Sequence, residues 1–495
     1  MTTFAAPLAN AWSTAWGTSG VRQAVIVGAL LLFGAFWGTV VAVAGLAAVL
    51  LFIAILACVF ILRDFRVGVG LLIVIMPIAQ SYAFPHAMFG ITGLNPLNLL
   101  LATTLGVYLM RAMGSSSVRH LVPWQLFVLY LLPLIMGAAI GTQHVHEIPA
   151  AYKAMDMIFF DNAVGYVRDL LLKPMSFVIY AVLVGAAVWR SKQPERFVTP
   201  LIISVWVMAA LIIGFVISSG VPISYLAGSY SRAFYTPLGM HANDLGRLYV
   251  VGYAILLFIW DRTSLKENLT LKALLFVSMA LAAAAMVLTF SRGAFLGFVI
   301  VNAIYIFSRA SWKTFMIVAA ALPPFLYFLP GAVWSRLQAG KGEGADAVSA
   351  GRIDGIWGPI MPEIFDHPFF GNGLGAIMYS KAVRSEQIDL IAHPHNAFLE
   401  LYLNMGIVGL VLVLAFWAWT WWRLRKLAKD DRVHPRLQGT FEGAAAGLVS
   451  FIVAGFAGSS FEPSAEQAFL WLAIGMMFGV SMQLKYGSRY KPKGT

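Results

Sequence analysis

The sequence predicts an all-α polytopic membrane protein with about fourteen transmembrane helices. The 495 residues are 60% hydrophobic and only 11% charged, with a mean hydropathy of +0.79, whereas a soluble domain carries about 25% charged residues. Apolar runs of about 20 residues recur along the chain, and this length crosses the hydrocarbon core of a bilayer. The runs show no alternation of apolar and polar residues, so they indicate helices rather than the strands of a barrel.

The individual spans follow from the length of each apolar run and from its polar flanks. The first two form one run of about forty residues, long enough for two crossings joined by a tight turn near Val43–Gly45. The ninth and tenth are separated only at Ser291–Gly293. The fourteen predicted spans lie near residues 24–42, 43–62, 67–82, 97–112, 122–141, 170–189, 198–218, 244–260, 271–289, 291–308, 314–330, 396–420, 441–459 and 465–484.

The basic residues predict how the chain is oriented. If the N-terminus is cytoplasmic and the spans alternate, nearly all short Lys/Arg-rich loops fall on the cytoplasmic side, as the positive-inside rule expects. This pattern explains the net charge of +12 and argues against nucleic acid as a partner. We therefore expect a multi-pass protein of the bacterial inner membrane with both termini cytoplasmic. The predicted cytoplasmic segments are Arg63–Arg66, Arg111–His120, Arg190–Arg196, Asp261–Asn268, Ser308–Lys313, Arg423–Arg436 and Lys485–Lys493.

The N-terminal residues, the single cysteine and the periplasmic loops allow further expectations. The first twenty residues contain no basic residue, so no cleavable signal peptide is expected, and the single cysteine excludes a disulfide framework. Within the longest periplasmic loop, residues 353–365 predict a short amphipathic helix, followed by a turn at 367–373. The larger periplasmic loops are predicted at 141–169, 219–243 and 331–395. The chain then divides into transmembrane helices 1–11 (1–330), the periplasmic loop (331–395), and transmembrane helices 12–14 with a basic cytoplasmic tail (396–495).

Arginines on the periplasmic side are the first candidate site residues. Arg292 lies where two apolar runs meet, and the turn there is too short to carry it away from the membrane. It could snorkel to lipid headgroups, but the positive-inside rule disfavours an arginine on this side, which favours a function. Arg232 and Arg247 lie in and just after the preceding polar loop, and Asn243 between them is alternatively the N-cap of the next helix.

Two histidines precede the twelfth span, in His393–Asn396. An imidazole at the end of a membrane helix can titrate near neutral pH and act as an acid or a base, while capping is the alternative role. Together with arginines on the same face, it would form a cationic, lipid-adjacent site suited to a phosphate or diphosphate. The sequence shows no metal-ligand spacing and no Gly-rich nucleotide loop, so neither a metal nor another cofactor is expected.

Four segments in a fixed order carry a recognisable pattern. They are Arg232 with Gly239 and Asn243, then Phe290–Gly293, then Arg352 with Trp357, Ile364 and His367–Gly373, and finally His395–Leu399 with Gly406–Gly409. These segments cover roughly residues 225–415. Their order and spacing resemble the O-antigen ligase and polysaccharide polymerase superfamily.

The resemblance implies a metal-independent, inverting membrane glycosyltransferase. It would transfer a glycan from undecaprenyl diphosphate to an acceptor hydroxyl at the periplasmic face. The acceptor is lipid A–core for a ligase of lipopolysaccharide biosynthesis, and a second lipid-linked repeat for a polymerase of O-antigen or exopolysaccharide. By position, Arg232 and Arg292 would bind the diphosphate, and His395 would orient or deprotonate the acceptor. The further substrate-binding candidates are Arg247, Arg352, Asn396, His393 and Asn243.

Several alternatives stay open at this point. His393 competes with His395 as the base, and the predicted number of spans exceeds that often assigned to the ligases, which favours a polymerase. A transporter or lipid-linked glycan flippase would also have many helices, but it usually shows midplane charges and inverted repeats. A structural subunit of a glycan-assembly complex is the third possibility, against which the cationic periplasmic residues argue.

Overall fold

The computed structural model describes residues 19–82, 87–88, 91–92, 95–112, 121–226, 234–264, 268–309, 316, 320, 331, 344, 346, 349, 351–458 and 460–487. Eight helical segments of this part are long and apolar enough to cross a membrane, and four further apolar helices are shorter. The chain is thus a helical, polytopic membrane protein, as predicted. The eight long segments are Leu126–Glu147, Ala163–Trp189, Pro194–Ser219, Ala242–Arg262, Leu269–Leu288, Ala397–Ala428, Pro435–Ala457 and Ala465–Tyr486.

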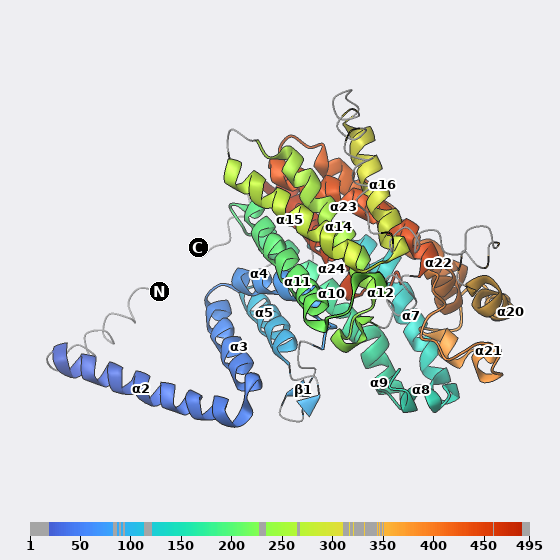
Figure 1. Cartoon of the computed structure of the whole chain (residues 1–495), viewed down its shortest axis with the longest axis horizontal. Helices are drawn as coiled ribbons and strands as arrows, with labels where there is room; N and C mark the ends of the chain where they lie inside the picture. Colours follow the sequence, from blue (N-terminus) through green and yellow to red (C-terminus); the bar gives the residue numbers. More distant parts are fainter. Residues whose placement is uncertain are drawn as a thin grey trace.

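Figure 1 follows the elements along the chain. The first are α2 (Ser19–Ala44), α3 (Leu46–Arg63), α4 (Phe65–Ile75), η1 (Met76–Ile78), β1 (Ala87–Met88), β2 (Ile91–Thr92), α5 (Pro96–Ala112), η2 (Leu126–Leu131), α7 (Leu132–Gly141), η3 (Thr142–Glu147), α8 (Ala151–Ala154), α9 (Ala163–Val167), η4 (Arg168–Leu172), α10 (Lys173–Trp189), η5 (Pro194–Phe197), α11 (Val198–Ser219) and α12 (Ile223–Leu226). The others are η6 (Thr236–Leu238), α14 (Ala242–Arg262), α15 (Leu269–Leu288), α16 (Arg292–Ser308), η7 (Ile353–Trp357), α20 (Gly358–Asp366), η8 (Ala376–Tyr379), α21 (Lys381–Arg384), α22 (Ala397–Ala428), α23 (Pro435–Ala454), η9 (Gly455–Ala457), η10 (Ala465–Gln467) and α24 (Ala468–Tyr486).

Every predicted span except 314–330 coincides with one of these helices, and 314–330 lies almost wholly outside the described residues. Both predicted tight turns are confirmed. α2 and α3 meet at Gly45, whose φ of 57° lies in the left-handed region that glycine adopts without steric cost, and α16 begins at Arg292. The number of fourteen crossings stays a prediction, because eight segments have the full length of a span.

The helix predicted at 353–365 is present, whereas the N-cap of α14 differs from the expected one. The helix predicted at 353–365 is formed by η7 and α20 together. The expectation that Asn243 caps α14 is wrong, because the N-cap is His241. The backbone of His241 is extended and its Nδ1 accepts a hydrogen bond from the Asn243 N–H at 3.2 Å. A ring nitrogen thus satisfies one of the N–H groups that the first turn leaves without a helical partner, and α14 starts earlier than the apolar run suggested.

α14 is the central helix of the bundle, since every residue from Leu245 to Ile259 is buried. It packs against α15, α16 and α23 (Figure 1). α23 presents Gly439, Gly443 and Gly447 to it at four-residue spacing, and a Cβ at Gly439 would lie only 2.6 Å from the Phe258 carbonyl oxygen. Small residues at this spacing let two backbones approach closely, which is how helices associate where lipid removes the hydrophobic driving force.

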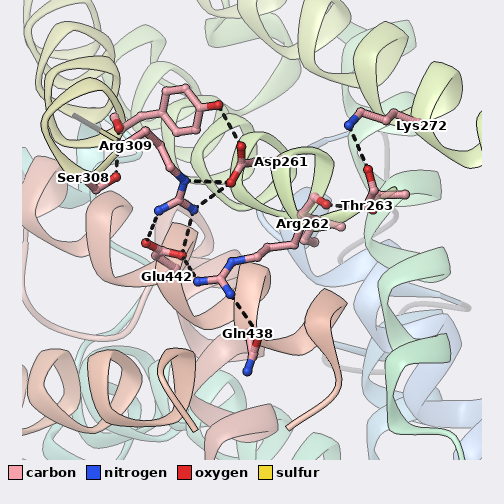
Figure 2. A network of polar contacts seen from close by, with 10 residues as sticks. Asp261, Arg262, Thr263, Lys272, Ser308, Arg309, Gln438 and Glu442 are labelled. Atoms are coloured by element: carbon pink, nitrogen blue, oxygen red, sulfur yellow. Dashed lines mark hydrogen bonds and ion pairs between the residues drawn. The ribbon is translucent and has the colours of Figure 1, made fainter. Parts of the chain in front are cut away.

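A polar network closes one end of this bundle (Figure 2). Arg309, just after α16, lies 2.7 Å from Asp261 of α14 and 3.0 Å from Glu442 of α23. Arg262 reaches the same Glu442 at 2.9 Å. Two guanidinium groups and two carboxylates therefore tie together the three helices that meet at this end, which the charge pattern predicts to be cytoplasmic.

The α14–α23 contact can be tested with a single methyl group. Gly443→Ala would place a Cβ against the backbone of Ala254 and Ile255, so we expect a loss of about 1–3 kcal/mol of unfolding free energy, measured as a lower Tm in detergent. Gly214→Ala in α11 is the matched control, since a Cβ there meets nothing within 4 Å and alanine favours a helix by about 1 kcal/mol. Equal melting of the two variants would contradict the close packing.

Candidate functional site

The predicted site residues that the structure describes gather at the end of the bundle opposite the network of Figure 2. α14 and α16 both start at this end, near Arg247 and Arg292, and both reach the network at their other end. α22 also starts here, directly after His395 and Asn396. We call this region the site end. Arg232 lies outside the described residues.

Arg247 is a firmly held cation of the site end, with 6% of its surface exposed. Its Nε lies 2.5 Å from Oε2 of Glu466 and its Nη2 lies 2.7 Å from Oδ1 of Asp244. Its Nη1 donates a hydrogen bond to the carbonyl oxygen of Gly458. Each guanidinium nitrogen therefore has a protein acceptor, and the side chain joins α14 to the segment between α23 and α24. This geometry favours a positioning role for Arg247 over the substrate contact predicted for it.

Arg292 is placed by the short turn between α15 and α16. Phe290 adopts a left-handed φ of 48°, which is uncommon for a bulky residue. Ser291 then caps α16 by accepting a hydrogen bond from the Ala294 N–H at 3.3 Å. The turn lies against α14, because a Cβ on Gly246 would come within 3.2 Å of the Ser291 Cβ. Half-buried Arg292 thus starts its helix beside the residue that precedes Arg247.

His393 and His395 stand side by side, with ring centroids 4.3 Å apart and planes at 82°. The carbonyl of Pro394 between them accepts a hydrogen bond from Trp357 Nε1 at 2.9 Å. His395 has a left-handed φ of 57°, and a Cβ on Gly458 would lie 3.4 Å from it. The same Gly458 accepts from Arg247, so Arg247 fixes the chain segment against which His395 rests.

The surroundings of His393 favour its neutral form. Part of the His393 side chain is exposed, but desolvation by the surrounding protein is the largest influence on its charge. This desolvation, followed by the positive fields of His241, Arg247 and Arg352, lowers the pKa of His393 to about 4. The ring is therefore uncharged at neutral pH and is able to accept a proton. Arg352 itself donates to the carbonyl of Ala457 at 2.8 Å, which places η7 over the end of α23.

Both asparagines among the candidates have local structural roles. Asn396 is the N-cap of α22, since its Oδ1 accepts from the N–H groups of Phe398 and Leu399 at 3.0 and 3.3 Å. Asn243 lies in the first turn of α14, where its N–H bonds to His241. Capping fixes where α22 begins and so fixes the position of His395 one residue earlier.

Three carboxylates of the site end, two buried and one half-buried, were not predicted. Glu400 and Glu466 are 9% and 5% exposed, and Glu462 accepts a hydrogen bond from Asn404 Nδ2 at 3.0 Å. Burial raises the pKa of Glu462 to about 7, against the opposing effect of the Asn404 bond, so this group exchanges a proton near neutral pH. The signal in the sequence was a set of acidic residues inside or next to apolar runs, where charges are costly and usually functional.

The predicted turn at 367–373 docks into a kink of α22. Gly406 has non-helical backbone angles, φ 63° and ψ −172°, which releases carbonyl groups from the helix. The N–H groups of Asn372 and Gly373 bond to the carbonyls of Leu403 and Asn404, both at 2.9 Å. The turn thus satisfies the acceptors that the kink exposes, as a membrane environment requires, and it fixes the long loop to the first half of α22.

The clamp around Arg247 makes a prediction about folding. Arg247→Met would leave Glu466 buried without its partner, and breaking a buried ion pair in this way costs about 3–5 kcal/mol. We expect poor insertion or a markedly lower Tm in detergent. Arg352→Met, which removes a partly exposed side chain that donates to the Ala457 carbonyl, should fold normally. Wild-type melting of Arg247→Met would show that Arg247 does not hold the site end together.

Residues 277–414 match the family model described as O-antigen ligase. A protein of Rickettsia conorii, provisionally described as a polysaccharide ligase, is 26% identical over 205 residues, which cover 38% of this chain and 47% of the relative. A counterpart in Rickettsia felis is 25% identical over 201 residues, with the same coverage. An O-antigen ligase of Pseudomonas aeruginosa is 27% identical over 135 residues, which cover 27% of this chain and 31% of the relative.

The chain spans about half the length, or less, of the curated relatives that it matches. The matched segment nevertheless contains Arg292, Arg352, His393 and His395, which are the residues that the fold gathers at the site end. Through residues 277–414, this polytopic membrane protein is thus similar to the O-antigen ligase family.

Proposed function

We propose that the protein is a glycosyltransferase that moves a glycan from undecaprenyl diphosphate to a sugar hydroxyl at the periplasmic face of the inner membrane. The observation that supports this proposal is that Arg292 and the two histidines lie at the same end of the bundle, although about a hundred residues separate them in sequence. The family match covers the same residues. The positive-inside pattern supports a periplasmic site end, because the basic loops lie at the other end.

Arginine is the expected group for the leaving diphosphate. As the bond between the anomeric carbon and the diphosphate oxygen breaks, negative charge grows on the diphosphate. A fixed guanidinium in a poorly hydrated site stabilises that charge without reorganising, and it grips phosphate oxygens bidentately. We assign this role to Arg292, together with Arg232. Arg247 would act through position, because its nitrogens already bind Glu466, Asp244 and Gly458.

The proton of the acceptor hydroxyl requires a base. In a single inverting displacement, the acceptor oxygen forms the new bond to the anomeric carbon as the diphosphate leaves, and its proton passes to an imidazole. His395 takes this role in our proposal, and the carrier's lipid tail remains in the bilayer throughout. The reaction would need no metal ion, because arginines supply the positive charge that a divalent cation supplies elsewhere.

The relatives favour a ligase over the polymerase suggested by the number of predicted spans. Those matched here are described as polysaccharide or O-antigen ligases. A ligase requires lipid A–core as acceptor, whereas a polymerase extends a second carrier-linked repeat. Reconstitution of the purified protein with each acceptor separates the two: product formed only with lipid A–core supports the ligase.

Arg292→Ala should reduce glycan transfer by at least a hundredfold, since removing one preorganised charge contact costs about 10²–10³ in rate. Transfer is measured with purified protein, lipid-linked donor and acceptor. The Tm of the variant is first shown to equal that of the wild type. Arg168→Ala is the control, because Arg168 is an exposed arginine of the same end that pairs with Asp169. Near wild-type transfer by Arg292→Ala would refute its contact with the diphosphate.

Substitution of the two histidines should assign the base. We expect His395→Asn to lose about 10²–10⁴ in rate, the usual value of general-base help, and His393→Asn to lose less than tenfold. The pH profile gives an independent readout. Because the pKa of His393 is about 4, a fall of activity only near pH 4 would mark His393 as the base. That result, or the opposite ranking of the two variants, would contradict the assignment to His395.

A further inference from the structure

A polar pocket lies apart from His393 and His395, with about 440 Å³ of empty space that is partly open to solvent. Its walls come from η3, the end of α20, the turn that follows it, and the segment from η8 to α21. The lining residues include His144, Glu147, Glu363, Asn372, Tyr379 and Arg384. The proposed transfer chemistry does not use this pocket, and the family match covers only the part of its lining from Glu363 to Arg384.

One wall of the pocket is a fixed stack of rings and charges. The imidazole of His144 lies parallel to the Tyr379 ring, with centroids 5.3 Å apart and planes at 14°. Tyr379 is buried, and its hydroxyl donates to the Asn372 carbonyl at 2.9 Å. Glu147 lies 2.7 Å from His144 Nδ1 and 2.6 Å from Arg384 Nη1. These side chains hold one another in place, so the wall is organised without a ligand.

The facing wall is built from α20 and the turn after it. One carboxylate oxygen of Glu363 accepts from the Ala382 N–H at 3.1 Å. The Asn372 amide nitrogen donates to the carbonyls of Glu363 and Leu403 at 3.2 and 3.4 Å. At the rim, Lys381 pairs with Asp366 at 3.0 Å, and both side chains are more than half exposed. The wall therefore presents carboxylate, amide and ammonium groups toward one space.

The charge balance of the pocket restricts the ligand. Three carboxylates stand against one lysine, one arginine and two imidazoles, so the site lacks the excess of positive charge that a phosphate requires. A metal ion is also a poor fit, because in the described part of the chain no three His, Cys, Asp or Glu side chains are arranged to hold one. Closely spaced acceptors and donors instead suit a ligand rich in hydroxyl groups, each of which both donates and accepts.

The pocket is rigidly connected to His393 and His395. η7 and α20 follow each other directly, and Trp357 at their junction bonds to Pro394, between His393 and His395. Glu363 lies six residues further along α20, which corresponds to roughly 9 Å of helix rise. The turn after α20 is in turn fixed to the kink of α22. A ligand in the pocket would thus lie a short, constant distance from the reacting groups.

We propose that this pocket binds a saccharide, namely sugar units of the donor or acceptor glycan beyond the reacting residue. The relevance of the pocket to transfer rests on the proposed function, but its binding of sugar does not. The chemistry is the same whichever substrate supplies the glycan. A pocket of this kind would select glycans by their outer sugars and orient the reacting sugar toward His395.

Binding can be measured without turnover. The full chain in detergent is titrated by calorimetry with two probes: the delipidated core oligosaccharide and the delipidated single repeat unit of the source bacterium's surface polysaccharide. We expect one probe to bind, and its identity assigns the pocket to the acceptor or the donor glycan. The double variant Glu147→Gln/Glu363→Gln should weaken that binding at least tenfold, because hydrogen bonds to charged groups are worth more than neutral ones.

The control and the contrary outcomes are defined by the same titration. Lys153→Gln removes an exposed ion pair with Asp161 outside the pocket and should bind as wild type. The single variant Glu363→Gln keeps an oxygen that accepts from the Ala382 N–H, so it should fold normally. We expect it to weaken sugar binding a few-fold. The proposal is overturned if wild type binds neither probe, or if the double variant binds as tightly as wild type. Normal transfer by Arg292→Ala would sink the proposed reaction while leaving sugar binding intact.

Discussion

The site end depends on one buried cation. Arg247 contributes its three nitrogens to Glu466, Asp244 and the Gly458 carbonyl, and so links the central helix to the segment before the last span. Gly458 in turn rests against His395. Because a charge buried among spans is costly unless it is paired, these partners must assemble together. The position of the candidate base thus depends on satisfying this guanidinium as well as on the Asn396 cap.

Close backbone packing supplies the frame on which this clamp acts. The glycines of α23 bring its backbone against α14, so both ends of these helices are held in register. At one end the network of Asp261, Arg309 and Glu442 fixes the ends of three helices (Figure 2). At the site end the same helices present Arg247 and the segment that leads to Gly458. These two packed helices therefore bring Arg247 and Gly458 together, although the two residues lie far apart in the sequence.

Features with a local physical cause were predictable from the sequence. The spans, the turn at Gly45, the start of α16 at Arg292 and the turn at 367–373 all follow from apolar length or from glycine and proline punctuation. What was missed depends on distant partners. His241 replaces Asn243 as the cap through its own ring nitrogen, and Glu466 gains its meaning only beside Arg247, 219 positions away. The polar pocket likewise joins Glu147 to Arg384, which no local pattern connects.

We propose that an anionic lipid headgroup sits between Arg292 and the two histidines, His393 and His395, at one end of the bundle. The most direct measurement is an electron cryomicroscopy structure of the full chain in a lipid nanodisc with undecaprenyl diphosphate added. We expect diphosphate density within hydrogen-bonding distance of Arg292, on the side of the bilayer where His395 lies. Density at the end that carries Arg309 and Glu442, or at the bilayer midplane, would contradict it.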